Sequence, residues 1–133
     1  MKALIMSLML LAATTVVSLA DEPPFVVPIA HDGVQRVEIL GGDYFFRPRH
    51  IVVKVNLPVE LVARKETFLT PHNLVIAAPE AGISVHESLS RDPQGIAFTP
   101  TKTGKYAIYC DKKLLFMDSH REKGMEAVLE VVE

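Results

Sequence analysis

The sequence has little excess charge and lacks the motifs of common enzymes. Beyond residue 20 it carries 13 basic against 16 acidic residues, a net charge of −3 with histidine neutral. This balance argues against a nucleic-acid binder that relies on a broad basic field. No GxGxxG occurs, and 113 residues hold only half of a doubly wound sheet, which argues against a dinucleotide-binding enzyme. The GxSxG, HExxH and P-loop motifs are also missing, so we expect a protein that is not an enzyme.

The first 20 residues contain a single charged residue, Lys2. An apolar stretch from Ala3 to Ala12 leads to Ser18-Leu19-Ala20, after which charged residues begin. This order predicts a secretory signal peptide over 1–20, cleaved near Ala20, and a periplasmic or secreted domain over 21–133. The alternative is a retained membrane anchor, which the hydroxyl residues Thr14, Thr15 and Ser18 and the lack of a basic stop-transfer flank disfavour.

The chain contains a single cysteine, Cys110. A single thiol cannot form an intramolecular disulfide. In the oxidising compartment that a signal peptide implies, a lone thiol usually has another role.

Helices of ordinary length are hard to place, because all nine prolines and all seven glycines fall after residue 20. Short apolar segments alternate instead with turn signals such as Thr103-Gly104, and several show the two-residue period of a half-buried strand. This pattern predicts an all-β, antiparallel sandwich, preceded by an extended arm or edge strand at 21–34. The predicted strands are 35–40, 50–55, 59–64, 72–77, 95–98, 105–110 and 125–132.

Side chains that bind metals fall in two places. His72 opens a predicted strand, while Cys110 closes another and Met125 opens the last one, so the loop between these two carries His120. Two histidines, a thiolate and a weak axial methionine are the ligands of mononuclear electron-transfer copper sites. The sequence therefore predicts one copper ion bound by these four residues.

The sequence resembles the cupredoxins, the blue-copper family of Greek-key β-sandwiches. The resemblance covers most of residues 35–133, and the spacing from His120 to Gly124-Met125 matches its plastocyanin-like form. The other segments that carry it are Gly42-Asp43-Tyr44-Phe45-Phe46-Arg47-Pro48, Pro58-Val59-Glu60-Leu61 and Thr103-Gly104-Lys105-Tyr106.

The resemblance implies a cupredoxin-like Greek-key fold and a copper ion held by His72, Cys110, His120 and Met125. It also implies one-electron exchange with a redox partner protein, with the electron leaving through an exposed imidazole edge. His120 is the expected exit because it lies on the loop. The binuclear copper centre of oxidase subunit II is disfavoured, because that centre requires two cysteines and this chain has one.

One feature departs from the family pattern. Nine residues separate Cys110 from His120, more than in familiar cupredoxins. The entropy cost of loop closure rises only logarithmically with length, so this insertion does not forbid the site. A long loop holds the copper geometry less rigidly and gives access to water, Met117 or Asp118. We therefore expect a weaker or shifted thiolate-to-copper charge-transfer spectrum.

Other functions are compatible with the same residues. A periplasmic copper carrier or storage protein would hold Cu(I) with the same sulfur and imidazole ligands and deliver it to a partner. A metal-free sandwich would serve as an interaction module, with Cys110 and Met125 as plain core, His72 hydrogen-bonded and His120 a loop residue. A nucleophile and base pair formed by Cys110 and His120 is the least favoured.

The remaining features lie outside the predicted ligand set. His31, His50 and His86 are expected to be surface histidines, the last one in a polar loop. Four consecutive apolar residues, 114–117, lie in the loop before His120, and full burial of each such side chain is worth roughly 1.5–3 kcal/mol. They either cap the copper end of the sandwich, which we expect, or form a docking patch.

Overall fold

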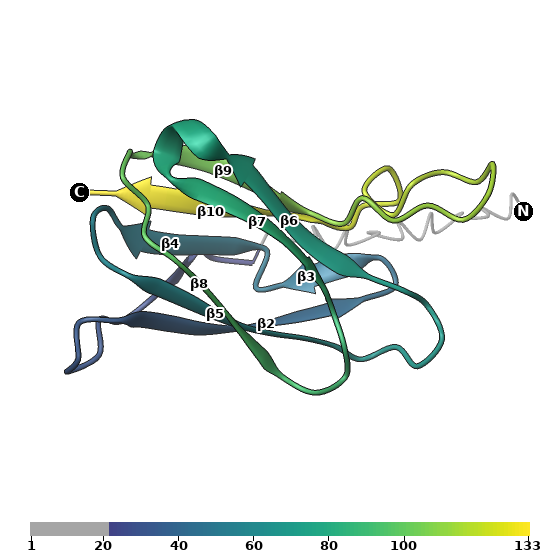
Figure 1. The fold of residues 1–133 in the computed structure, drawn as a ribbon, viewed down its shortest axis with the longest axis horizontal. Coiled ribbons are helices and arrows are strands. Elements are labelled where there is room, and N and C mark those ends of the chain that lie inside the picture. Colours follow the sequence, from purple (N-terminus) through teal and green to yellow (C-terminus); the bar gives the residue numbers. More distant parts are fainter. Residues whose placement is uncertain (1–21) are drawn as a thin grey trace, which may run out of the picture.

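The computed structural model describes residues 22–133, so the predicted signal peptide at 1–20 lies outside the described residues. This part of the chain forms ten strands and one short 3-10 helix (Figure 1). The strands are β1 (Phe25–Val26), β2 (Gln35–Gly42), β3 (Phe45–Arg47), β4 (His50–Lys54), β5 (Val59–Lys65), β6 (Asn73–Ala78), β7 (Ile83–Ser88), β8 (Gln94–Phe98), β9 (Gly104–Tyr109) and β10 (Glu126–Val132), with the helix η1 (Pro79–Ala81) after β6.

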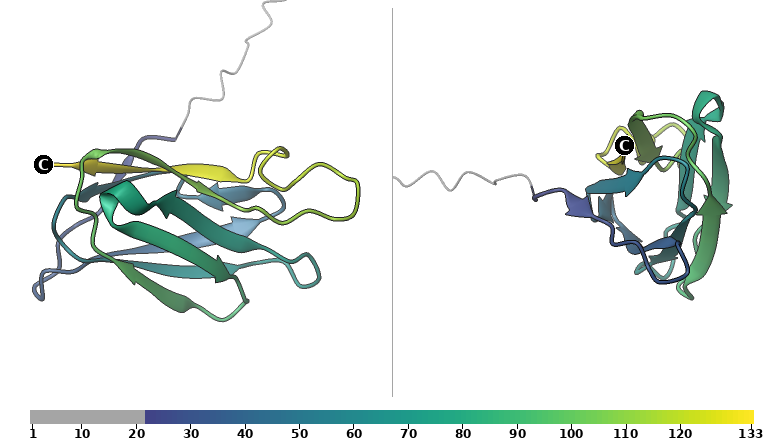
Figure 2. Two further views of the ribbon diagram at one scale, coloured as in Figure 1. Left: turned by 45° about the horizontal axis from the view of Figure 1, so that its top comes forward. Right: turned by 90° about the vertical axis from the view of Figure 1, so that its left-hand side faces the viewer.

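The strands form two sheets packed as a sandwich (Figures 1 and 2). The larger sheet has the strand order β1-β4-β10-β9-β6-β7, and the smaller has the order β3-β2-β5-β8. Strands far apart in the sequence are neighbours in both sheets, because the chain crosses repeatedly between the two layers. The all-β sandwich predicted from the sequence is confirmed.

The sheets are mixed, which corrects the prediction of an antiparallel sandwich. β4 runs parallel to both β1 and β10, and β2 runs parallel to β5. Parallel neighbours need a crossover connection, and the excursions of the chain through the opposite sheet provide it. Strand direction depends on this path and not on the local alternation of apolar residues.

All seven predicted strands are present, with ends shifted by no more than two residues, and the predicted edge strand is β1. Sequence patterns missed β3 and β7. The first has only three residues, and in the second only Ile83 and Val85 are buried before the segment becomes polar. His86 therefore lies on a strand and not in the predicted polar loop.

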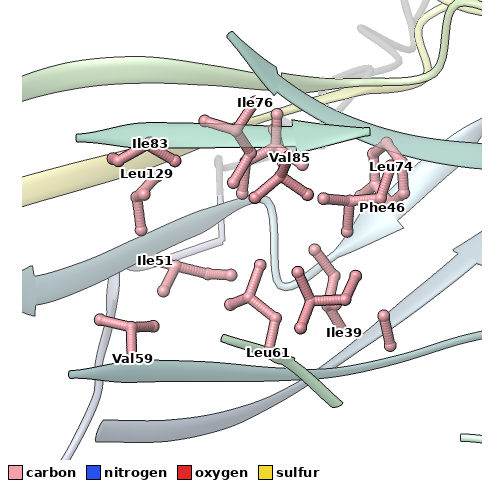
Figure 3. Close-up of a cluster of buried hydrophobic side chains, with 14 of the residues drawn as sticks. Ile39, Phe46, Ile51, Val59, Leu61, Leu74, Ile76, Ile83, Val85 and Leu129 are labelled. Atoms are coloured by element: carbon pink, nitrogen blue, oxygen red, sulfur yellow. The ribbon is translucent and has the colours of Figure 1, made fainter. Parts of the chain in front are cut away.

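Alternating side chains of the two sheets meet in a continuous apolar core (Figure 3). Strand β5 buries Val59, Leu61 and Ala63, and strand β10 buries Leu129 and Val131 from the opposite sheet. The two-residue period read from the sequence is therefore the period of core burial. This core fixes the relative positions of the strands whose ends carry the candidate ligands.

Three strand ends meet at one end of the sandwich. Tyr109, the last residue of β9, pairs with Val75 near the start of β6 and with Glu126 at the start of β10. Both pairings are antiparallel, so the start of β6, the end of β9 and the start of β10 lie side by side. The residues just outside these strands are His72, Cys110 and Met125.

Truncation of the core should destabilise the whole domain. We expect Leu61→Ala, at a fully buried position in β5, to lower the free energy of unfolding by about 2–5 kcal/mol, because it removes apolar contacts and leaves a cavity. The measurement is urea denaturation followed by circular dichroism. The neighbouring Val62→Ala, on the half-buried opposite face, should cost less. Equal losses at the two positions would contradict this assignment of the core face.

Candidate metal centre

His72, Cys110 and His120 place one ligand atom each within 4.8 Å of one another. The Nδ1 atoms of the two histidines are 3.1 Å apart, and the Cys110 Sγ is 3.6 Å from Nδ1 of His120. All three residues are buried. The structure therefore brings together two imidazole nitrogens and a sulfur from segments that are 38 and 10 residues apart in sequence.

Asn73 holds Cys110 in place from the neighbouring strand. Its backbone N–H donates to the cysteine Sγ at 3.4 Å. Its side-chain amide donates to Asp111 Oδ1 at 2.6 Å and accepts from the Asp111 backbone N–H at 3.0 Å. Two segments that meet only in the folded state are thus joined at the sulfur and at the residue that follows it. Sequence reasoning did not identify Asn73, because nothing in its local pattern distinguishes it from any strand residue.

Backbone hydrogen bonds fix His120 although its loop is long. Its N–H donates to the carbonyl of Lys112 at 2.8 Å, and its carbonyl accepts from the N–H of Met125 at 2.9 Å. Ser119 and Glu122 cap the following turn reciprocally, each backbone N–H donating to the other side chain, at 2.7 and 3.2 Å. Both ends of the loop are therefore ordered next to the donor cluster.

Met125 is fully buried at the start of β10. Its carbonyl accepts the N–H of Cys110 at 3.2 Å, so its backbone contacts both candidate ligands of the loop. A Cβ added at Gly41 would lie 3.1 Å from the Met125 methyl group. The absence of a side chain at Gly41 therefore leaves the space that the thioether occupies.

The turn between β2 and β3 closes the cluster. Asp43 Oδ1 lies 2.8 Å from Nε2 of His72, and the ring of Tyr44 lies 4.9 Å from that of His120, centre to centre. Lys123 Nζ lies 4.6 Å from the centre of the Tyr44 ring. In the sequence, Asp43 and Tyr44 stand out only as part of a segment of the family resemblance, because they lie 29 and 28 positions before His72, too far for a local signal.

Burial sets the protonation of the cluster. Desolvation lowers the pKa of His72, against the opposing effect of Asp43, and it also lowers the pKa of His120, where the charges of His72 and Lys123 act in the same direction. Desolvation raises the pKa of the Cys110 thiol, which the Asn73 N–H partly offsets. The histidines are therefore kept neutral, as metal ligation requires.

These residues fit a bound transition-metal ion. The two close Nδ1 atoms can share only one proton between them when no cation is present, whereas a metal ion uses both lone pairs. His120 Nε2 is buried without a hydrogen-bond partner in the described structure, so the ring relies on its other nitrogen for a polar contact. Imidazole and thiolate together are a donor set that suits copper or zinc.

The expected exit through an exposed imidazole edge is wrong. His120 has no exposed surface and His72 is 1% exposed. The β2–β3 turn covers one side of the cluster, where the ring of Tyr44 packs against the rings of His72 and His120. The two side chains that the long loop was expected to offer as extra ligands, Met117 and Asp118, are both exposed, so neither lies in the buried cluster.

The remaining histidines lie away from the cluster. His31 is exposed, and His86 is largely exposed on β7, where its Nε2 lies 3.1 Å from Asp111 Oδ2. His50 departs from the expected surface position, because it is half-buried with Nε2 2.6 Å from Glu130 Oε2.

The apolar stretch at 114–117, here called the apolar tip, does not cap the sandwich. Its turn is closed by the Met117 N–H, which donates to the Leu114 carbonyl at 2.9 Å. Leu115 is 86% exposed and Phe116 is 93% exposed. In Figure 1 and in the left view of Figure 2, the loop that carries the apolar tip projects beyond the ends of the strands. The expected capping is wrong, because the insertion extends into solvent.

Solved structures share this fold at low sequence identity. The metal-binding domain of the Cu(I)-exporting P-type ATPase CopA of Streptococcus pneumoniae D39 gives a TM-score of 0.62 at 18% identity, over 82% of this chain and 95% of that one. Reduced auracyanin from Roseiflexus castenholzii gives 0.58 at 17% identity, over 74% and 97%. The periplasmic domain of cytochrome oxidase subunit II (CoxB) of Bradyrhizobium japonicum gives 0.55 at 19%, over 80% and 88%.

This chain has the cupredoxin fold. The family resemblance read from the sequence is thereby confirmed at the level of the fold, and the His72–Cys110–His120 cluster lies within it. No protein-family model and no curated protein matches the sequence. Within residues 22–133, no helix is long and apolar enough to cross a membrane.

The two buried histidines make the stability of the metal-free protein dependent on pH. Their pKa values are lowered by folding, so the unfolded chain takes up protons first, near the ordinary histidine pKa of about 6.5. The contribution of these histidines to the free energy of unfolding is therefore fully present above about pH 6.5. It is lost as the pH falls toward their folded-state pKa values, by up to about 1.4 kcal/mol per pH unit for each histidine.

The measurement is urea denaturation of the metal-free protein at several pH values between about 7 and 5. His72→Gln should flatten the pH dependence, whereas His31→Gln, which changes an exposed histidine, should leave it unchanged. A wild-type slope equal to that of His72→Gln would show that His72 is not held neutral.

Proposed function

We propose that the protein is exported by its signal peptide, binds one copper ion and passes single electrons to a redox partner protein. His72 and His120 would supply imidazole nitrogens, Cys110 would supply the thiolate, and Met125 would supply a weakly bound thioether sulfur. The observation that carries this proposal is the buried convergence of two Nδ1 atoms and one Sγ at one end of a cupredoxin fold.

Copper bound by these residues supplies a couple between Cu(II) and Cu(I). The protein's own residues hold the donors in place before metal arrives: Asn73 fixes the sulfur, and the hydrogen bonds of the loop backbone fix His120. Preorganised donors change little between oxidation states, which is the property that electron transfer needs. Burial excludes water from the cluster, and soft sulfur ligation favours copper over the hard cations.

A copper carrier or storage protein is the second candidate. The similarity to a Cu(I)-exporting ATPase domain, whose structure contains Cu(I), supports it. The hydrogen bonds that anchor both ends of the loop favour electron transfer, because release of the metal would have to disturb them. A metal-free interaction module gives no purpose to the buried convergence of the two Nδ1 atoms with the Cys110 Sγ. A nucleophilic role for Cys110 is disfavoured, because the thiol is buried and its pKa is raised.

Copper uptake tests the ligand assignment. The mature chain, 21–133, should bind about one copper ion per monomer and show thiolate-to-copper charge transfer. Cys110→Ala should abolish this absorption and lower the copper content. His86→Ala, at a largely exposed histidine outside the cluster, is the matched control and should behave as wild type.

Unchanged copper binding by Cys110→Ala would refute the ligand assignment. The intensity and position of the charge-transfer absorption also test the effect of the long loop on the copper geometry. The weaker or shifted spectrum expected from the loop length stays a prediction. An ordinary intense blue spectrum would mean that the nine residues between Cys110 and His120 leave the copper geometry undisturbed.

The apolar tip is the contact for the redox partner in this proposal. Cys110 and His120 flank the tip in sequence, so a protein that binds it lies at the end of the sandwich where the donors lie. Leu115 and Phe116 expose apolar surface without a partner in the described structure, and burying such surface drives protein association.

The double variant Leu115→Ser, Phe116→Ser should slow electron exchange several-fold and leave the thermal midpoint almost unchanged, because both side chains are already exposed. Electron self-exchange between oxidised and reduced copper-loaded protein, measured by NMR line broadening, needs no knowledge of the partner. Ile29→Ser, at an exposed apolar residue in the connection before β2, is the control. A lower thermal midpoint with unchanged self-exchange would contradict the docking role.

A further inference from the structure

The two histidines of the cluster differ in what their second ring nitrogen contacts. Nε2 of His72 lies 2.8 Å from Asp43 Oδ1. Nε2 of His120 is buried and has no hydrogen-bond partner in the described structure. One imidazole is therefore anchored by a carboxylate, whereas the other is held only through its backbone and its ring contacts.

Asp43 is itself oriented by the fold. It lies in the short turn between β2 and β3, and its second oxygen, Oδ2, accepts the Thr70 hydroxyl at 3.2 Å. Its side chain is 43% exposed, whereas the side chain of His72 has no exposed surface. The carboxylate therefore stays partly exposed to solvent, and it delivers one oxygen to a ring nitrogen on a fully buried side chain.

This contact selects one tautomer of His72. An ionised carboxylate only accepts hydrogen bonds, so Nε2 has to carry the proton. The neutral ring then has its lone pair on Nδ1, the atom that faces Nδ1 of His120 and belongs to the donor cluster. Carboxylate partners of this kind orient metal-binding histidines and make their free nitrogen a stronger donor.

We propose that Asp43 is a positioning residue, which fixes the tautomer and orientation of His72 and, through the stronger Nδ1 donor, favours Cu(II) over Cu(I). The second part rests on the proposed copper function, whereas the first concerns the metal-free chain. A negative charge next to one ligand stabilises the more highly charged metal ion, so Asp43 lowers the reduction potential of the site.

The tautomer is tested in the metal-free protein. The ring nitrogen resonances of His72, measured by NMR with 15N-labelled histidine, should show a proton on Nε2 and none on Nδ1. Asp43→Ala should give a mixture of tautomers. Asp32→Ala removes an exposed carboxylate that pairs with Arg36, and it should leave His72 unchanged. A wild-type ring protonated on Nδ1 would overturn the anchoring role, and this measurement requires no variant to fold.

The effect on copper is tested by redox titration of the loaded protein. Asp43→Asn keeps the size of the side chain and removes its charge. It should lower the preference for Cu(II) over Cu(I) by about tenfold, which raises the potential by about 59 mV for a one-electron couple. Asp32→Ala should not change the potential.

The outcomes separate the two proposals. If the wild-type chain binds no copper, the proposed function fails, while the tautomer in the metal-free protein still decides whether Asp43 anchors His72. If copper binds and Asp43→Asn leaves the potential unchanged or lowers it, the influence of Asp43 on the oxidation state is refuted. A raised potential together with an Nε2-protonated ring in the wild type supports both parts.

Discussion

The pairing register at Tyr109 is the constraint on which the rest of the site depends. This residue pairs with Val75 on one side and with Glu126 on the other, which sets the start of β6 and the start of β10 beside the end of β9. Cys110 follows directly, and the Asn73 N–H reaches its sulfur from β6. A shift of one residue in either pairing would turn the affected side chains to the other face of the sheet and separate the donor atoms.

The donor cluster is costly for the metal-free chain. Burial holds two imidazoles neutral, keeps the thiol protonated and, among residues 22–133, leaves His120 Nε2 without a partner. Groups buried in this way destabilise a fold unless another interaction compensates. The strand core, Asp43 and the hydrogen bonds of the loop supply that compensation, so the apolar sandwich supports a polar end that would not form by itself.

The long loop divides into two parts with opposite properties. Its ends are fixed, since the His120 N–H reaches back to Lys112 and the following turn is capped by Ser119 and Glu122. Its middle, the apolar tip, projects into solvent. The extra length of the loop thus lies outside the donor cluster. The fold accommodates it between Cys110 and His120 without separating these two candidate ligands.

The sequence by itself determined the all-β class, the seven main strands and the three residues whose side chains converge in the buried cluster, because strand periodicity and side-chain chemistry are local properties. Tertiary structure decided the rest. Strand direction followed from crossovers between the sheets, and Asp43 met His72 only because a turn and a strand end share one end of the sandwich. The apolar tip shows the limit most clearly: hydrophobic composition predicts burial, but burial requires a neighbouring surface, and the part of the chain that the structure describes places none over Leu115 and Phe116.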